Sequence, residues 1–182
     1  MANIGVVGIG RLGLCFALNL ERAGFDVFGV DANPDYIDTI QSKTLKSNEP
    51  LVEAFLKESE YLSVSNDLKS IVEQNAEIVF ICVPTPSNPE GSFDHSAIDM
   101  VCDELLTFDQ PKREMHLVIN STVMPGYCDA LHARMSPHGY SISYNPEFIA
   151  QGTIMADQQN PDQVLIGEAN EDAGNQIEAV YR

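Results

Sequence analysis

Ten residues near the N-terminus predict the architecture of this 182-residue chain: Ile4-Gly5-Val6-Val7-Gly8-Ile9-Gly10-Arg11-Leu12-Gly13. An apolar, strand-like run ends at Gly8, and three glycines follow in the spacing Gly-x-Gly-x-x-Gly. An apolar periodicity typical of a helix then extends from Leu12 to Ala23. A glycine triplet between a strand and a helix is typical of the phosphate-binding turn of dinucleotide-binding folds. We therefore expect the backbone of Gly8, Ile9, Gly10, Arg11, Leu12 and Gly13 to bind a pyrophosphate.

The three glycines have separate physical roles, and an acidic residue completes the pattern. Gly8 allows a tight turn, Gly10 lets the backbone approach a pyrophosphate, and Gly13 lets the helix pack closely on the strand. Asp31 follows the next apolar run, 18 residues after Gly13, where a carboxylate would accept hydrogen bonds from both hydroxyls of an adenosine ribose. The same carboxylate would repel a 2′-phosphate, so the sequence predicts NAD rather than NADP. The alternative is a tight strand-to-helix turn with Asp31 merely on the surface.

Apolar runs of strand length alternate with segments of helical periodicity along the rest of the chain. This alternation predicts a doubly wound α/β fold of the Rossmann type, with a mostly parallel sheet, in a single domain spanning residues 1–182. Strands are predicted at Ile4–Val7, Phe25–Val30, Leu62–Val64, Ile78–Val83, Leu117–Ile119, Tyr140–Tyr144 and Gln163–Ile166. Helices are predicted at Leu12–Ala23, Pro34–Gln41, Glu53–Glu58, Asp67–Glu73, Ala97–Leu106, Asp129–Met135 and Ala173–Tyr181.

The composition is that of a globular protein, with 44% hydrophobic and 20% charged residues. Its 27 acidic residues against 10 basic ones give a formal net charge of −17, which disfavours nucleic acids and anionic membrane surfaces as partners. A phosphorylated ligand must then be bound by local devices such as the N–H groups at a helix N-terminus. The apolar runs are far too short to span a membrane and the N-terminus lacks a signal-peptide pattern, so we expect a cytoplasmic protein.

The cysteines and histidines form no recognisable metal or disulfide pattern. Four cysteines lie far apart without a Cys-x-x-Cys pair, and we interpret them as core thiols without a reactive role: Cys15, Cys82, Cys102 and Cys128. The four histidines have neither helical i,i+4 spacing nor a cysteine partner, so we expect surface or helix-end positions for His95, His116, His132 and His138. No metal site is predicted.

Ordered motifs continue beyond the glycine turn. They are Val30-Asp31, Val83-Pro84-Thr85-Pro86 with Gly91-Ser92, Ser121-Thr122-Val123, Asn145-Pro146-Glu147-Phe148 and Asn160-Pro161-Asp162-x-Val164. Together with the glycine turn, this set resembles the N-terminal NAD-binding domain of the UDP-glucose/GDP-mannose 6-dehydrogenase family over nearly the whole chain. The resemblance implies an enzyme that uses two NAD⁺ to oxidise the C6 alcohol of a nucleotide sugar to a carboxylate. In that family a cysteine captures the intermediate aldehyde, and water then releases the acid from a thioester.

The resemblance also implies roles for individual residues. Those implied to contact the cofactor, besides the glycine turn and Asp31, are Tyr36, Thr85, Pro86, Ser121, Thr122 and Gln151. Thr122 would also position the catalytic water, and Glu147 would serve the hydrolytic step as a base or water-positioning carboxylate. The sugar pocket would be lined by Glu147, Phe148, Ile149, Ala150 and Gln151. A dry pocket would raise the pKa of Glu147. The alternative is a loop glutamate that caps a short helix near Phe148.

Several positions depart from the family pattern. Tyr36 stands where a lysine or arginine is common, and Gln151 stands where a second glutamate is usual, so both change the charge beside the cofactor. The family's catalytic cysteine lies in a Gly-x-Cys segment of a second domain, and no cysteine of this chain stands in such a segment. We therefore expect the cofactor-binding half of an enzyme, ending at the start of a connecting helix. The C-terminal half would act in cis or in trans, and the full enzyme would be a homo-oligomer.

Two other functions fit parts of the sequence. A non-enzymatic NAD-binding module would explain Gln151 and the absent half equally well. A dehydrogenase that transfers a single hydride from a hydroxy acid shares the fold and a Ser-Thr-Val-like turn, but it leaves Asn145–Phe148 unexplained. Within the family, Gly152 after the Asn-Pro-Glu-Phe block favours UDP-glucose over GDP-mannose as the substrate.

Overall fold

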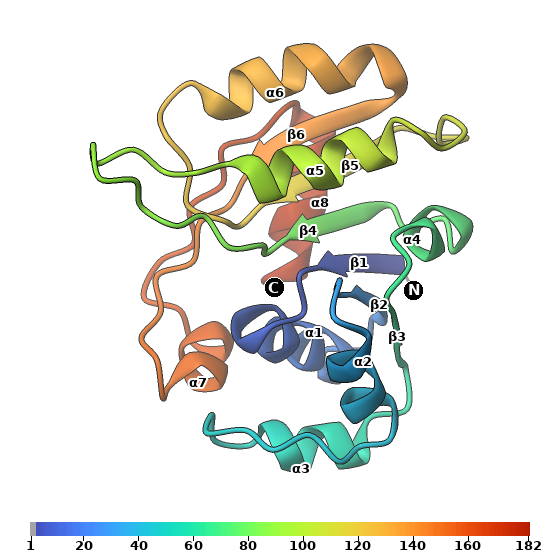
Figure 1. The fold of residues 1–182 in the computed structure, drawn as a ribbon, viewed down its shortest axis with the longest axis vertical. Helices are drawn as coiled ribbons and strands as arrows, with labels where there is room; N and C mark the ends of the chain where they lie inside the picture. The colour runs from blue at the N-terminus through green and yellow to red at the C-terminus, as the bar shows by residue number, and fades with distance from the viewer. Residues whose placement is uncertain (1–2) are drawn as a thin grey trace.

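A parallel sheet of six strands runs through the centre of the computed structural model, which describes residues 3–182 (Figure 1). The strands lie in the order β3-β2-β1-β4-β5-β6, and neighbouring strands are parallel throughout. Their bounds are β1 Asn3–Val7, β2 Asp26–Val30, β3 Leu62–Ser65, β4 Ile78–Ile81, β5 Met115–Ile119 and β6 Tyr140–Tyr144. The chain winds outward first from β1 to β3 and then from β4 to β6, so β1 and β4 flank the switch point at which such sheets bind ligands. The predicted Rossmann-type fold is confirmed.

Helices cover both faces of this sheet (Figure 1). One buried cluster joins the sheet to α1 (Arg11–Arg22), α2 (Pro34–Gln41), α3 (Val52–Glu58), α7 (Ile154–Gln159) and α8 (Glu171–Val180). A second cluster joins the other face to α4 (Lys69–Glu73), α5 (Ser96–Leu105) and α6 (Tyr127–Met135), and a 3₁₀ turn at Ser136–His138 follows α6. Alternation along β4 supplies both clusters, because Ile78 and Phe80 belong to the first whereas Val79 and Ile81 belong to the second. Within residues 3–182, no helix combines the length and the apolar character that crossing a membrane requires.

One of the predicted elements was wrong. The segment Gln163–Ile166 is not a strand, because the chain only crosses the end of β6 there: Tyr144 and Gly167 form a single antiparallel bridge, with N–H···O distances of 2.8 and 2.7 Å. The short helix near Phe148, which only the alternative role of Glu147 requires, is absent from the described residues. The next helix is α7, which begins at Ile154 and which the sequence pattern did not predict.

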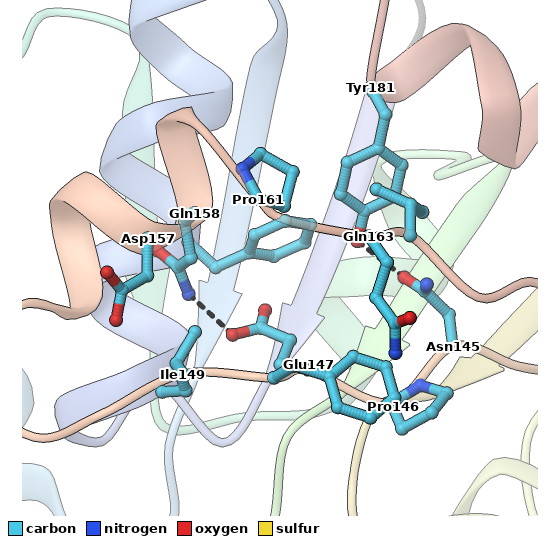
Figure 2. A pocket seen from close by; sticks show the side chains of 12 residues that line it. Asn145, Pro146, Glu147, Ile149, Asp157, Gln158, Pro161, Gln163 and Tyr181 are labelled. Carbon is cyan, nitrogen blue, oxygen red and sulfur yellow. Dashed lines mark hydrogen bonds between the residues drawn. The ribbon is translucent and has the colours of Figure 1, made fainter.

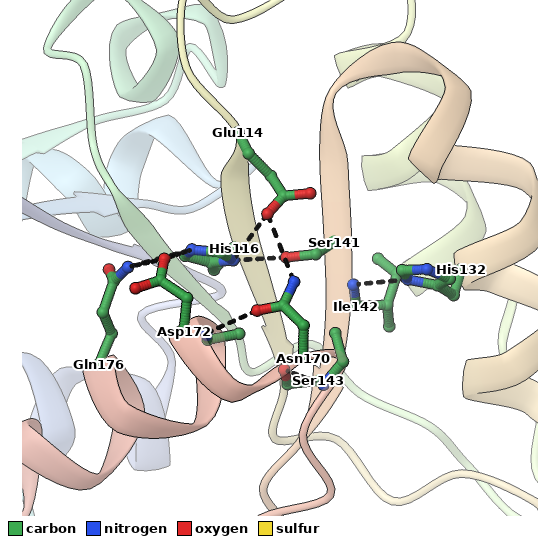
Figure 3. Close-up of polar contacts among 11 residues, drawn as sticks. Glu114, His116, His132, Ser141, Ile142, Ser143, Asn170, Asp172 and Gln176 are labelled. Atoms are coloured by element: carbon green, nitrogen blue, oxygen red, sulfur yellow. Dashed lines mark hydrogen bonds and ion pairs between the residues drawn. The ribbon is translucent and has the colours of Figure 1, made fainter.

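The last helix, α8, is joined to the sheet by polar contacts around His116 (Figure 3). The His116 side chain points to the same face of the sheet as Val118, two residues further along β5, so it lies on the face that α8 covers and is only 3% exposed. Its Nδ1 lies 2.5 Å from Ser141 Oγ, and its Nε2 lies 3.4 Å from Asp172 Oδ2 and 3.2 Å from Gln176 Nε2. The expectation of a surface or helix-end position for His116 was therefore wrong. This cluster lies near the start of β5, at the opposite end of the strand from the carboxyl edge.

Candidate functional site

The glycine turn joins β1 to α1 at the carboxyl edge of the sheet. Gly8 has φ +85°, and a Cβ atom there would lie 2.8 Å from the Cys82 carbonyl oxygen. A Cβ atom on Gly13 would lie only 2.2 Å from the Gly8 carbonyl oxygen, so the close approach of α1 requires glycine. At Gly10, in contrast, no heavy atom lies within 4 Å of the Cβ position. Protein packing explains the first and third glycines, and open space beside the second fits the approach of a ligand.

The first turn of α1 presents unpaired backbone donors to that space. The N–H groups of Gly8 and Ile9 donate to the Val30 carbonyl, and the helical hydrogen bonds begin with the Leu14 N–H donating to the Gly10 carbonyl at 2.9 Å. In the described chain no side chain caps this helix. The N–H groups in between are left for a ligand, and the helix dipole favours a negative one.

A cavity of about 520 Å³ opens beside this helix end. It brings together Gly10, Arg11, Asp31 and Tyr36, as the dinucleotide-binding pattern and the family resemblance predict. Asp31 lies at the end of β2, where its Oδ1 accepts a hydrogen bond from the Asn33 N–H at 3.0 Å. Burial, together with the charge of Asp31, raises the pKa of the Tyr36 hydroxyl to about 12, so Tyr36 is neutral here.

Sequence reasoning missed one cation of this cavity. Lys46 lies in the loop between α2 and α3 and lines the cavity, and its Nζ pairs with Glu53 Oε2 at 3.0 Å. Nothing in the local sequence around Lys46 marks it as a binding residue, since only the packing of α3 against α1 brings this loop to the glycine turn. With Arg11 it places two positive charges in a strongly acidic chain.

A second, much smaller pocket surrounds Glu147 (Figure 2). Its volume of about 20 Å³ is sufficient for about one water molecule. Gln158 on α7 donates from Nε2 to Glu147 Oε2 at 2.9 Å, whereas Glu147 Oε1 is buried without a partner among the described residues. Burial raises the pKa of Glu147 to about 7, and the hydrogen bond from Gln158 opposes that rise. This direction agrees with the one expected for a carboxylate in a dry pocket.

Asn145 fixes the start of the loop that carries Glu147 (Figure 2). Its backbone N–H donates to the Ile119 carbonyl at 2.9 Å, and its own carbonyl accepts from Asn120 Nδ2 at 2.9 Å. Its side chain donates to the Leu165 carbonyl at 2.8 Å and accepts from the Tyr181 hydroxyl at 2.5 Å. The loop therefore leaves β6 in a defined direction, and no helix forms at Phe148 for Glu147 to cap.

The remaining residues of the predicted sugar pocket divide into two groups. Phe148 and Ile149 line the same pocket as Glu147. Ala150 and Gln151 lie outside it in an exposed turn, where the Ala150 N–H donates to Asp157 Oδ2 at 3.0 Å. Gln151 Oε1 instead accepts from Arg11 Nη1 at 3.1 Å. Gln151 thus joins the turn after the Glu147 loop to the glycine turn.

The other predicted cofactor contacts lie at the same edge but line neither pocket. Ser121 is buried, and its hydroxyl donates to the Val83 carbonyl at 2.7 Å, which ties together the segments that follow β4 and β5. Thr122 beside it is exposed. Thr85 and Pro86 lie in the loop after β4, with Thr85 half-buried and Pro86 exposed. Ser121 therefore has a structural task, and Thr122 is free to contact a ligand.

The cysteines are free thiols, and none of them is activated. Burial raises the pKa of the Cys15 and Cys102 thiols to about 12 and that of Cys128 to about 11. Burial also raises the pKa of Cys82 well above its ordinary value. A nucleophilic cysteine needs a depressed pKa, so the interpretation of these residues as unreactive thiols is supported.

Comparison with known proteins agrees with this site. A sequence profile of the UDP-glucose/GDP-mannose dehydrogenase family, NAD binding domain, matches residues 2–182. The chain is 31% identical to GDP-mannose 6-dehydrogenase of Pseudomonas aeruginosa over 99% of its own length and 44% of that enzyme. It is 30% identical to UDP-glucose 6-dehydrogenase of Rickettsia conorii over 98% of its own length and 42% of that enzyme.

Solved structures give the same result. A crystal structure of a ternary complex of GDP-mannose dehydrogenase from P. aeruginosa superposes with a TM-score of 0.90 over 98% of this chain and 44% of that one. A UDP-glucose dehydrogenase from Pyrobaculum islandicum, 29% identical, gives 0.91 over 100% of this chain and 44% of that one. The chain thus spans less than half the length of the relatives it matches. It belongs to the UDP-glucose/GDP-mannose dehydrogenase family, whose NAD-binding domain it represents, and its cofactor is NAD.

Proposed function

We propose that this chain is the NAD-binding portion of a nucleotide-sugar 6-dehydrogenase that oxidises a C6 alcohol to a carboxylate in two NAD-dependent steps. The observation that carries the proposal is the Glu147 pocket. A simple hydride-transfer enzyme does not need a buried carboxylate that has a pKa of about 7, one free oxygen and room for a single water. An enzyme that must also hydrolyse a covalent intermediate does need one.

The residues of the chain divide the work of such an enzyme. When bound, NAD⁺ accepts the hydride from the sugar. The first turn of α1 and Arg11 bind the cofactor's pyrophosphate, and Asp31 accepts hydrogen bonds from its adenosine ribose. Glu147 holds a water through its free Oε1 and takes a proton from it, because a carboxylate with a pKa of about 7 is a competent base near neutral pH.

In this proposal the activated thiol comes from a part of the enzyme that corresponds to the remainder of the relatives' length, which this chain does not span. The raised pKa values of the four cysteines support this assignment, because none of these thiols is prepared to attack an aldehyde. The proposed partner of this chain is therefore a C-terminal half that acts in cis or in trans. We also propose that the full enzyme is a cytoplasmic homo-oligomer.

The sugar nucleotide that we propose is UDP-glucose. Gly152 supports this choice, because the resemblance associates a glycine at this position with UDP-glucose and a serine with GDP-mannose. Gly152 has φ +93°, a backbone conformation in which a serine would be strained. The turn after the Glu147 loop is therefore built for glycine.

Cofactor choice is tested by calorimetric titration of the chain with NADH and NADPH. We expect NADH to bind at least tenfold more tightly, a difference of about 1.4 kcal/mol, because Asp31 repels a 2′-phosphate. Asp31→Asn should reduce the preference to about threefold or less. Asp35→Asn, at an exposed position in the first turn of α2, is the matched control and should behave as the wild type. Equal affinities of the wild type for the two cofactors would contradict the assignment of Asp31.

The hydrolytic role of Glu147 is tested in the complete enzyme with UDP-glucose and, for comparison, GDP-mannose. Glu147→Gln should leave the first hydride transfer within about threefold of the wild type in a single turnover. Steady-state turnover should fall about 10²–10⁴-fold, which is the usual contribution of a general base. Unchanged steady-state turnover would remove Glu147 from the mechanism.

A further inference from the structure

Glu49 is a buried carboxylate that sequence reasoning did not single out. It lies in the loop between α2 and α3, is 4% exposed, and receives the Gly152 N–H on both oxygens, at 2.9 and 3.0 Å. The two residues are 103 positions apart in the sequence. This contact therefore joins two loops that approach the site from different parts of the chain.

Both ends of this contact lead to the cofactor cavity. On one side Ser47 and Asn48, which directly precede Glu49, line the cavity beside Gly10. On the other side Gly152 follows Gln151, whose Oε1 accepts the hydrogen bond from Arg11 at 3.1 Å. The contacts run from Glu49 through Gly152 and Gln151 to Arg11, and Arg11 stands at the start of α1 where the pyrophosphate donors lie.

The buried Glu49 carboxylate has fewer hydrogen-bond donors than a carboxylate with a purely structural role would need. A buried carboxylate is costly unless several donors satisfy it, and within residues 3–182 Glu49 accepts only from the Gly152 N–H. Glu21, at the other end of α1, shows the ordinary structural solution: its Oε1 accepts from Ser59 Oγ and from the N–H groups of Glu60, Tyr61 and Leu62. Glu49 instead directs both of its oxygens at a single N–H in a turn that Gly152, at φ +93°, makes possible.

We propose that Glu49 is a positioning residue of the nucleotide-sugar dehydrogenase site. It holds the Ala150–Gly152 turn so that Gln151 keeps the Arg11 guanidinium beside the phosphate-binding turn. The inference rests on the proposed function, because it assigns to Glu49 a task in binding NAD. The carboxylate receives the Gly152 N–H on both oxygens, whereas a glutamine has only one acceptor oxygen and would present its NH₂ group to the same donor, so a glutamine at position 49 would hold the turn less firmly.

The test is a double-mutant cycle in which titration calorimetry measures the NADH affinity of each variant. Thermal unfolding of each variant is measured in parallel. Glu49→Gln and Gln151→Ala should each weaken NADH binding about tenfold. Because both act through Arg11, the double variant should bind no more weakly than about the worse of the two single variants. Glu21→Gln is the matched control, since it removes a buried carboxylate at the end of α1 that lies away from the glycine turn: it should lower Tm but leave NADH affinity unchanged. Amide hydrogen exchange at Gly152 should accelerate in Glu49→Gln without cofactor.

Each outcome decides between the alternatives. A merely structural role predicts that Glu49→Gln behaves like Glu21→Gln, with a lower Tm and wild-type affinity, and that result overturns the inference. Additive losses in the double variant overturn it as well. Gln151 is exposed, so Gln151→Ala tests the inference even where Glu49→Gln does not fold, and wild-type NADH affinity in Gln151→Ala is contrary to it. A wild-type chain that fails to bind NADH overturns the proposed function itself, together with this inference.

Discussion

Alanine substitutions at Gly13 and Gly10 should have opposite effects on folding and on cofactor binding. A Cβ atom at position 13 would lie 2.2 Å from the Gly8 carbonyl oxygen and 3.1 Å from its carbon, so α1 must move by about 1 Å to restore ordinary contact. Such overpacking against backbone costs about 3 kcal/mol, and the better helix propensity of alanine offsets about 1 kcal/mol of it. The net loss of about 2 kcal/mol should lower Tm by about 4–8 °C in a chain of this size.

Gly10→Ala places its methyl group where no protein atom lies within 4 Å. Alanine is a clearly poorer N-cap than glycine, so stability should fall by about 1 kcal/mol, which is less than the loss expected for Gly13→Ala. NADH affinity should fall at least tenfold, or about 1.4 kcal/mol, because the methyl group takes the space through which the pyrophosphate reaches the N–H groups of α1. Thermal unfolding and calorimetric titration of the two variants measure both effects. Wild-type NADH binding by Gly10→Ala, or a wild-type Tm for Gly13→Ala, would refute the division of roles within the turn.

Three further expectations concern Glu147, the activity of the chain alone and Tyr181. Folding raises the pKa of Glu147 from 4.5 to about 7, so the wild type should lose up to roughly 3 kcal/mol of stability relative to Glu147→Gln as the pH rises from about 4.5 to about 7. Urea unfolding of both proteins at pH 5 and pH 8 measures this loss. A difference in unfolding free energy that is the same at both pH values contradicts the expectation. The 182-residue chain alone, mixed with NAD⁺ and UDP-glucose or GDP-mannose, should form no NADH above background at 340 nm, because hydride transfer requires the C6 alcohol to be held close to the nicotinamide and the proposed C-terminal half completes the sugar site. Sustained NADH formation would reveal an active site not described above. Tyr181→Phe removes the hydroxyl that donates to Asn145 and should lower stability by about 1–2 kcal/mol, and an unchanged Tm would show that α8 does not stabilise the Glu147 loop.

The strands and most helices could be predicted from the sequence because each has a strong local signal. The completely apolar β4 and the Asn33-Pro34 start of α2 are examples, and in α2 the Asn33 side chain accepts a hydrogen bond from the Tyr36 N–H. The run Val164-Leu165-Ile166 has the composition of a strand, yet it crosses the end of β6 instead of pairing along it. Composition cannot distinguish these two cases, because the number of ladder hydrogen bonds depends on the direction in which the chain returns to the sheet.

The candidate site could be predicted in part for a similar reason. The glycine turn and Asp31 are defined by local spacing, and the structure brings both to one cavity. Glu147 came only from the family resemblance, since an isolated glutamate after a strand has no signature of its own. Lys46 and Glu49 were missed, because the α2–α3 loop has no motif and reaches the site only through the packing of α3 on α1. The same holds for His116, whose burial depends on α8 covering its face of β5.

The acidity of the chain and its affinity for a dianionic cofactor are compatible because they act over different distances. The net charge of −17 produces a repulsion that is largely screened beyond a Debye length of about 8 Å at physiological ionic strength. The N–H groups of the first turn of α1 act at hydrogen-bond distance, where salt does not screen them, and Arg11 and Lys46 lie in the same cavity. An anion that cannot reach the N-terminus of α1 experiences only the electrostatic repulsion from the net negative charge of the chain. The geometry at Gly10, rather than the overall charge, therefore decides which phosphorylated molecules the chain accepts.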